Sequence, residues 1–140
     1  MERIEECISF LLGKAYQQVN QASKRRLAPY GVTPAQYAVL KVLAGRDGQT
    51  GSELGDRLVL DSATITGLLD RLERAGLLER RADATDRRVH RIFVTAQGRE
   101  MQPALDRAMD ALNVEFLARL TPADAERLRA QLAVLGKPGE

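Results

Sequence analysis

Residues 60–80 read LDSATITGLLDRLERAGLLER, and this stretch decides the fold. At about 100° per residue, its apolar side chains fall within about 120° of one another on a helical wheel. They belong to Ile65, Leu68, Leu69, Leu72 and Ala75. Asp61 and Ser62 supply a helix cap, and Gly76 suits the left-handed residue that often ends a helix. We therefore expect a helix from Ser62 to about Ala75 with one buried face.

The opposite side of this helix carries little bulk. It consists of Ala63, Gly67, Asp70 and Arg74, flanked by Thr66 and Arg71. Glycine inside a helix costs about 1 kcal/mol relative to alanine, and a merely solvated face normally carries Glu, Lys or Gln. Small residues beside short hydroxyl groups and arginines suit a helix that enters the DNA major groove. Taken alone, the stretch also fits an ordinary amphipathic helix with a tolerated glycine.

The neighbouring segments complete a helix-turn-helix pattern with a wing. Upstream, Thr50 and Glu53 have the spacing of a capping box and open a short helix. Downstream, residues 77–81 and 89–94 read as two strands around a polar loop. Arg87 and Arg88 lie at the tip of this hairpin, from which an arginine can enter the minor groove. A solvated charged loop is the alternative for the tip alone.

Composition and charge indicate one globular domain with an anionic partner. The chain has 140 residues, of which 44% are hydrophobic and 29% are charged, enough for one sizeable core. The net charge is only +2, but residues 71–95 hold seven arginines against four acidic residues. Such a cluster favours phosphate. No apolar run approaches the roughly 20 residues of a membrane span, and the acidic N-terminus does not resemble a secretion signal. We expect a cytoplasmic protein without membrane contact.

Long helices flank the central lobe on both sides. The first is expected from Ile4 to Leu27, with a length of about 36 Å. Its apolar stripe consists of Ile4, Ile8, Leu11, Leu12, Ala15 and Val19. Because the helix exceeds what the chain needs to cover its own core, part of this stripe is expected to meet a second subunit. A further helix opens at Thr33 and Gln36 with a capping box.

Two more helices are expected after the hairpin. The first runs from Ala96 to about Leu120 and contains Pro103, which should kink it. The second opens at Thr121 and carries an apolar stripe of Leu128, Leu132 and Leu135. The predicted fold class is therefore mainly α with a small β-hairpin wing: a winged helix-turn-helix with a helical dimerisation region from the N- and C-terminal helices.

In several motifs the chain resembles the MarR family of bacterial regulators. These motifs are residues 60–80, Asp86-Arg87-Arg88 in the wing, residues 94–98, and residues 33–37 at the start of the second helix. The resemblance covers nearly the whole chain. It implies a single domain that forms a two-fold homodimer, with dimerisation helices in residues 1–31 and 96–140 and a DNA-binding lobe in residues 32–95.

The resemblance also implies a binding site and a function. Each helix 62–75 would enter the major groove of one half of a near-palindromic site in double-stranded DNA, and Arg88 would reach the minor groove. The expected DNA-binding residues are Ser62, Ala63, Thr64, Thr66, Gly67, Arg71, Arg87 and Arg88. Many members of the family are repressors that release DNA when a small molecule binds, and aromatic acids or their thioesters are common ligands.

The ligand site is less well defined by the sequence. Phe10, Lys14, Tyr16 and Tyr37 lie on the two helices that would line it. Each of these residues is also compatible with an ordinary place in a helical core. A lysine near the site would suit an acidic ligand.

Other chemistries have little support in the sequence. Cys7 is the only cysteine, and the simplest interpretation is a small apolar residue on the first helix. In the branch of the family that senses hydroperoxides, the reactive position falls at Ser9, so that mechanism is disfavoured, while a thiol-based redox role of Cys7 stays open. His90, the only histidine, has no evident catalytic partner, and no cofactor, metal or catalytic motif occurs. We expect no enzyme; a winged-helix module for protein contacts is the remaining alternative.

Overall fold

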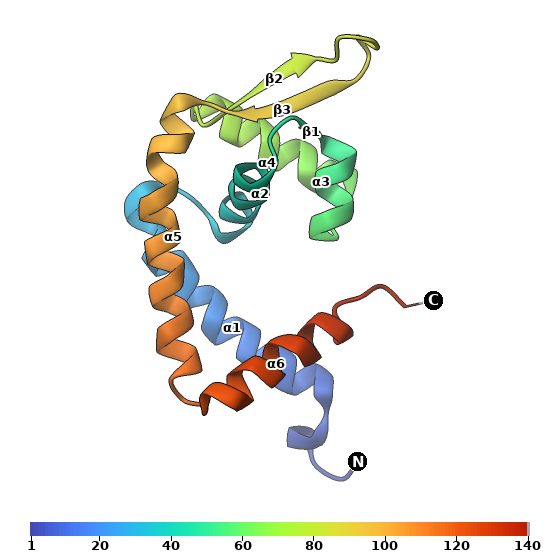
Figure 1. The fold of residues 1–140 in the computed structure, drawn as a ribbon. Coiled ribbons are helices and arrows are strands. Elements are labelled where there is room, and N and C mark those ends of the chain that lie inside the picture. Colours follow the sequence, from blue (N-terminus) through green and yellow to red (C-terminus); the bar gives the residue numbers. More distant parts are fainter. Residues whose placement is uncertain (140) are drawn as a thin grey trace.

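The computed structural model describes residues 1–139 and divides them between a lobe and a helical arm (Figure 1). The lobe contains α2 to α4 and a small sheet, whereas α1 and α5 run side by side away from it and α6 follows at the far end of α5. The elements, in order, are a 3-10 turn (Ile4–Glu6), α1 (Ile8–Leu27), a second 3-10 turn (Ala28–Tyr30), α2 (Pro34–Gly45), β1 (Gln49–Thr50), α3 (Gly51–Leu58), α4 (Ser62–Arg74), β2 (Leu78–Ala82), β3 (His90–Val94), α5 (Ala96–Leu117) and α6 (Pro122–Leu135). The predicted fold class is confirmed.

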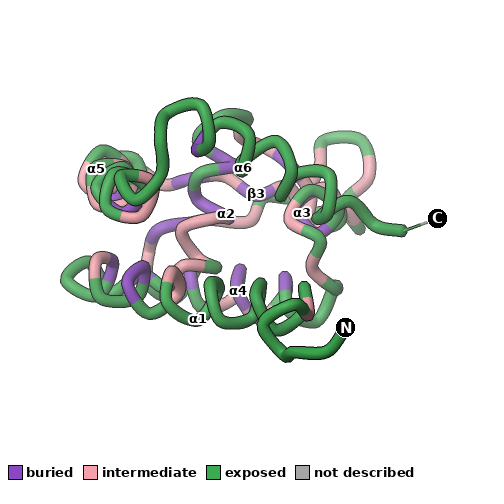
Figure 2. Tube along the Cα trace, turned by 90° about the horizontal axis from the view of Figure 1, so that it is seen from below, coloured by how far each residue is buried: buried purple, intermediate pink, exposed green. Residues whose placement is uncertain are grey.

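The hydrophobic core lies almost entirely in the lobe. Leu40, Leu43, Leu54, Leu72 and Ile92 are fully buried and come from α2, α3, α4 and β3. The arm contributes only a few buried side chains, as Figure 2 shows by the exposed trace of α1 and α6. No described helix combines the length and the apolar character that a membrane span requires.

The wing contains one more strand than the sequence predicted. The antiparallel sheet has the order β1-β3-β2, and Gln49 of β1 pairs with Ile92 of β3. Two residues are too few to give the alternating pattern that identifies a strand from sequence. The two predicted strands are confirmed, but both begin one residue later than expected, at Leu78 and His90.

Side-chain caps open α2, α4, α5 and α6. The side chains of Thr33, Asp61, Thr95 and Thr121 each accept a hydrogen bond from the backbone N–H three residues later. The capping box predicted for Thr50 is only half formed. The Thr50 hydroxyl accepts from the N–H of Glu53 at 3.1 Å, but the Glu53 carboxylate lies 2.7 Å from Arg46 instead of returning to the cap.

The first helix does not run unbroken from Ile4, so that prediction was wrong. Cys7 has an extended backbone (φ −78°, ψ 117°) and forms the N-cap of α1, after a separate 3-10 turn. The Glu6 carboxylate accepts the backbone N–H of Glu2 at 2.9 Å, and this bond stabilises the separate turn. At its other end, α5 stops at Leu117, three residues before the predicted end.

Close backbone contact fixes α5 to the root of the wing. A Cβ on Gly98 would lie 2.5 Å from the carbonyl oxygen of Leu77, so only glycine fits there. The Thr95 hydroxyl donates to the carbonyl oxygen of Gly76, a residue with φ +78°. Glycine adopts this left-handed conformation without a steric penalty. The end of α4, the wing and the start of α5 are therefore held together.

Candidate nucleic-acid interface

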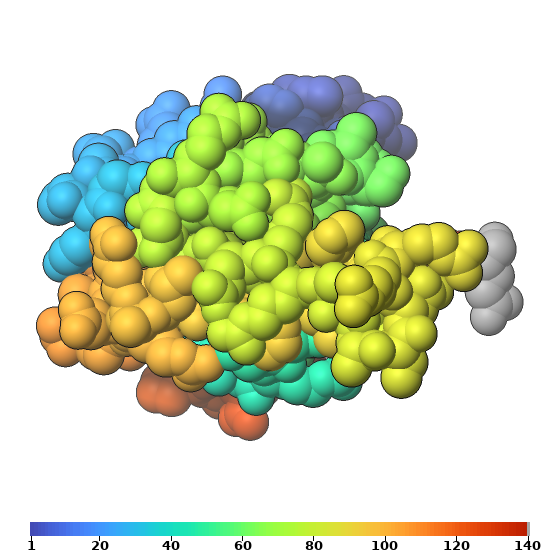
Figure 3. All heavy atoms as spheres, turned by 90° about the horizontal axis from the view of Figure 1, so that it is seen from above, coloured from blue at the N-terminus to red at the C-terminus, as the bar shows by residue number. Residues whose placement is uncertain are grey.

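The exposed side of α4 has the composition that the sequence predicted. Ser62, Ala63, Thr64 and Thr66 are exposed, and the buried face consists of Ile65, Leu68, Leu69 and Leu72. Ala75, predicted to be buried with them, is exposed because it caps the helix just before the chain turns at Gly76. Figure 3 shows the face that α4 and the wing share.

Asp61 caps the N-terminal end of α4. The Asp61 carboxylate accepts the backbone N–H of Thr64 at 2.7 Å. This hydrogen bond lowers the pKa of Asp61, so the cap stays ionised at neutral pH. Ser62 and Thr64 therefore lie at a capped helix end, where the partial positive charge of the helix dipole favours an anion.

Asp83 organises the loop at the tip of the wing. Its carboxylate accepts hydrogen bonds from the side chain of Arg91 at 2.6 Å, from the hydroxyl and N–H of Thr85, and from the N–H of Asp86. The Arg91 bond is the main reason that the pKa of Asp83 lies well below its usual range. Arg91 also donates to the carbonyl oxygen of Gly48, which ties the loop to the residue just before β1.

Arg88 projects from this ordered loop. Its guanidinium donates to both carboxylate oxygens of Asp86, at 3.1 Å and 3.3 Å, yet 91% of its side chain is exposed. The same pairing lowers the pKa of Asp86. Arg87 is also exposed. A carboxylate that holds an exposed arginine in one orientation reduces the entropy that the side chain loses on binding.

Arg80 joins α4 to the wing, a role that the sequence analysis missed. From β2, its guanidinium contacts Asp70 at 2.8 Å and Glu73 at 3.0 Å. Its backbone N–H also donates to Glu73. The sequence shows two acidic residues on α4 and an arginine at the third position of the following strand. It does not show that they form ion pairs, because that depends on how the chain turns between α4 and β2. These contacts hold α4 and the wing as one unit.

A cleft separates the helix-turn-helix from the wing. Its volume is about 410 Å³, and Ser62, Thr66, Arg80 and His90 contribute to its lining. His90 thus borders the exposed face of α4, but among residues 1–139 no cluster of His, Cys, Asp or Glu could hold a metal ion. A ligand that lies across both α4 and the wing could contact the polar side chains that line this cleft.

The candidate ligand residues lie in different parts of the structure. Phe10 and Lys14 line one hollow on α1, and the Lys14 ammonium lies 5.9 Å from the centre of the Phe10 ring. Tyr16 is 67% exposed. Tyr37 lies on α2, where its hydroxyl donates to Asp106 of α5 at 2.9 Å. Cys7 is half-buried at the start of α1.

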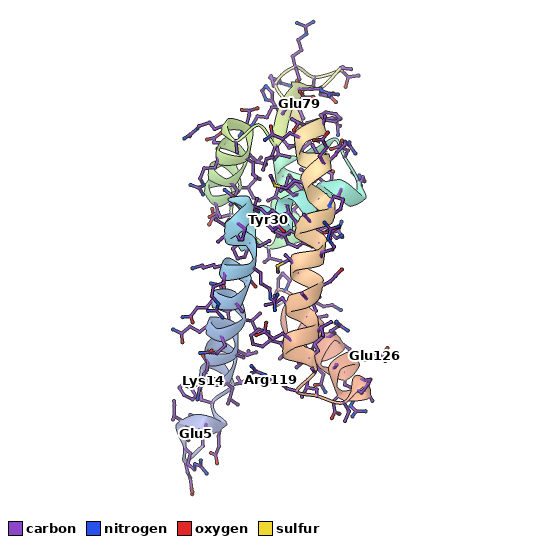
Figure 4. All side chains as sticks on the ribbon, turned by 90° about the vertical axis from the view of Figure 1, so that its left-hand side faces the viewer. Glu5, Lys14, Tyr30, Glu79, Arg119 and Glu126 are labelled. Carbon is purple, nitrogen blue, oxygen red and sulfur yellow. The ribbon has the colours of Figure 1, made fainter. Side chains whose placement is uncertain are left out.

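A second hollow, of about 270 Å³, lies between α1 and α5. Leu11 and Phe116 contribute apolar surface to it, and Lys14 and Arg119 contribute positive charge. Figure 4 shows Lys14 on α1 and Arg119 just after the end of α5, both at the opposite end of the molecule from Glu79 in the wing.

Comparisons with known proteins agree with this arrangement. Residues 30–89 match the model of the MarR family. Transcriptional regulator HosA of Escherichia coli O157:H7 is 32% identical over 127 residues, which are 87% of this chain and 93% of HosA. HTH-type transcriptional regulator MhqR of Bacillus subtilis (strain 168) is 35% identical over 88 residues, 63% of this chain but only 61% of MhqR. These relatives are transcriptional regulators, not enzymes.

The structural comparison extends over almost all of the chain. The transcriptional repressor CouR bound to a 23-mer DNA duplex has a TM-score of 0.85 at 27% identity, covering 98% of this chain and 97% of CouR. CouR from Rhodococcus jostii RHA1 bound to p-coumaroyl-CoA has a TM-score of 0.88 at 26% identity, covering 100% of this chain and 99% of CouR. The protein therefore belongs to the MarR family of winged helix-turn-helix transcriptional regulators.

Proposed function

We propose that this protein is a repressor that binds a near-palindromic site in double-stranded DNA as a homodimer and is released by a small acidic ligand. The observation that carries the proposal is the face shared by α4 and the wing. It combines exposed hydroxyl groups and nearly bare helix backbone with the projecting side chain of Arg88. The similarity to CouR, which has been solved on a DNA duplex, supports the same use of this face.

Each part of the face has a distinct role in this proposal. Ser62, Ala63, Thr64, Thr66 and Gly67 lie against base edges in the major groove, where little bulk and short polar groups permit close approach. The Arg88 guanidinium enters the adjacent minor groove, whose negative potential attracts it. Arg87 contacts phosphate from the same loop, and such contacts fix the register of the protein on the duplex.

The arm supplies the dimer interface. Ile8, Leu11 and Leu12 of α1 and Leu132 and Leu135 of α6 are all exposed in the single chain. Large contiguous apolar patches on a soluble domain mark interaction surfaces. In the proposed division, residues 1–31 and 96–140 contain the helices that supply the interface, and residues 32–95 form the DNA-binding lobe.

The effector is proposed to be an aromatic acid or its thioester. Phe10, Lys14, Tyr16 and Tyr37 remain the candidate ligand residues, and the positive charge of Lys14 and Arg119 beside apolar surface suits an acidic aromatic molecule. The p-coumaroyl-CoA bound to CouR is such a thioester. Isothermal calorimetry with p-coumarate and p-coumaroyl-CoA should show binding that Lys14→Ala weakens; equal affinity for both proteins would remove Lys14 from the site.

A gel-shift titration against the DNA upstream of the protein's own gene, at two salt concentrations, tests the proposed function. Tight, sequence-selective binding that weakens with salt is expected. Arg88→Ala should weaken binding to all sequences and reduce the salt slope by about one for each wing. Arg107→Ala, which removes an exposed arginine from the middle of α5, is the matched control and should leave the slope unchanged.

Two results would contradict the proposal. An unchanged slope for Arg88→Ala would reject the role of the wing. No selective binding, either to this DNA or in a selection from genomic fragments, would favour a winged-helix module for protein contacts instead.

A further inference from the structure

The gap that Gly67 leaves in the side chains of α4 is covered by another residue. A Cβ placed on Gly67 would lie 3.5 Å from Nη2 of Arg71 and 3.8 Å from both Cζ and Nη1. Three atoms of a planar group at similar distances mean that the guanidinium lies broadside over the glycine. The Arg71 side chain therefore runs back by one turn along α4, as long helical side chains tend to do.

This conformation moves the charge of Arg71 toward the middle of the exposed face. On the helical wheel Arg71 itself lies at the flank, about 40° beyond Gly67 and about 80° beyond Ala63. Its guanidinium, however, lies over Gly67, in the middle of the side that carries the fewest atoms. A flank position favours contact with phosphate, whereas the middle of an inserted helix faces the base edges.

The carboxylates nearest to Arg71 in the sequence already have another partner. Asp70 and Glu73 both contact Arg80, at 2.8 Å and 3.0 Å. Within residues 1–139, no hydrogen bond or ion pair joins the exposed Arg71 side chain to an acceptor. Arg88 differs, because Asp86 occupies two of its donors. The Arg71 fork keeps its donors available for a ligand.

We propose that Arg71 is a specificity-determining residue that reads one guanine in each half-site, with its guanidinium held over the gap at Gly67. Guanine presents two acceptors, O6 and N7, to the major groove, and an arginine fork donates to both at once. The proposal rests on the function proposed above. Gly67 then has a second role besides close approach to the DNA, because its missing side chain leaves room for the Arg71 guanidinium.

A selection from random-sequence duplex DNA, using the full chain and sequencing of the bound fraction, tests this assignment. The wild-type protein should enrich a symmetric motif with one guanine preferred in each half. Arg71→Ala should reduce the preference for that guanine by roughly 5- to 150-fold while the other positions of the motif persist. Arg71→Lys should reduce it too, because an ammonium lacks the planar fork. Gly67→Leu should lose the same preference and also bind all sequences more weakly, since its side chain occupies the place of the guanidinium and adds bulk to the side of α4 that approaches the bases.

Arg107→Ala removes one arginine from the outward side of α5 and should leave the motif unchanged. The proposal is overturned if Arg71→Ala enriches the wild-type motif and only weakens binding to all sequences with a smaller salt slope, because Arg71 would then be a phosphate contact. If the wild-type protein enriches no motif at all, the proposed function fails and the assignment of Arg71 falls with it. Circular dichroism of each variant checks that folding is retained.

Discussion

The two ends of the molecule expose opposite kinds of surface. On α4 and the wing, the exposed side chains include hydroxyl groups, small residues and arginines. On α1 and α6, they include Ile8, Leu12, Leu132 and Leu135. Water solvates the first surface readily and the second poorly. The difference indicates that the lobe meets a charged polymer, whereas the arm is completed by protein.

The largest expected effect comes from placing bulk and negative charge on the DNA-facing side. Gly67→Glu should reduce DNA affinity at least about 100-fold, because its carboxylate places negative charge and bulk in the groove and also pairs with the Arg71 guanidinium, which lies 3.5 Å from a Cβ at this position. Folding should be retained, since glutamate is favoured over glycine in a helix interior. Gel shift and circular dichroism measure the two properties.

Gly67→Gln has the same size without the charge and is the matched control. It should bind DNA more weakly than the wild type but better than Gly67→Glu. Tight binding by Gly67→Glu would sink the assignment of α4 as the helix that enters the groove.

A charge in the apolar surface of the arm should act on assembly instead. Leu132→Asp should convert the dimer to monomers, because an unpaired carboxylate buried in an apolar interface costs several kcal/mol. Sedimentation velocity would show the change. Ala130→Asp puts the same group on roughly the opposite side of α6 and should stay dimeric. If both variants remain dimers, the exposed stripe of α6 is not the interface.

The wing should lose its order in acid. The pKa of Asp83 is lowered in the folded state, so its contribution to stability is present above the unfolded value near pH 4 and is lost as pH falls below it. Asp83→Asn imitates the protonated carboxyl at neutral pH, where trypsin is active, and trypsin cleavage after Arg87 or Arg88 then reports the order of the loop. Asp83→Asn should be cleaved faster than the wild type at neutral pH and should bind DNA several-fold more weakly.

Asp110→Asn removes an exposed carboxylate from α5 and is the control for this experiment. Equal cleavage rates for Asp83→Asn and the wild type would mean that Asp83 does not hold the loop.

The smallest effect is expected from a substitution that changes stability but neither of the two surfaces. Val59, in the turn between α3 and α4, has φ +55° and is 64% exposed. A β-branched residue is disfavoured in this left-handed region, which Asn tolerates better. Val59→Asn should therefore raise the free energy of unfolding by up to about 1 kcal/mol, measured in urea. A loss of stability would show that the Val59 side chain makes a favourable contact that outweighs the strain.

Much of the lobe could be predicted because its signals are local. Caps at Thr33, Asp61 and Thr95 need only residues three positions apart. The buried side of α4 follows from helical spacing, except at Ala75, where the helix ends. Strand β1 escaped prediction because its two residues are defined by their pairing with β3 and not by their own pattern.

The details of the site depended on contacts between distant residues. The sequence placed Arg88 at the wing tip, but it did not reveal that Asp83 orders the loop through Arg91 or that Arg80 ties the wing to α4. Likewise, Glu53 had the spacing of a capping box, yet Arg46 captures its carboxylate. A long charged side chain can reach several possible partners, and the fold determines which of them lies within hydrogen-bonding distance.

Hydrogen exchange of the full chain, measured with and without a DNA fragment that the protein selects, tests most directly whether α4 and the wing bind DNA while the arm binds a partner chain. Saturating DNA should slow exchange in residues 61–75 and 83–91, which hold the exposed side of α4 and the wing loop. Residues 122–135 of α6 should exchange at the same rate in both states, because the arm faces its partner chain throughout. Slowed exchange confined to α6, with α4 and the wing unchanged, would contradict the assignment of the two surfaces.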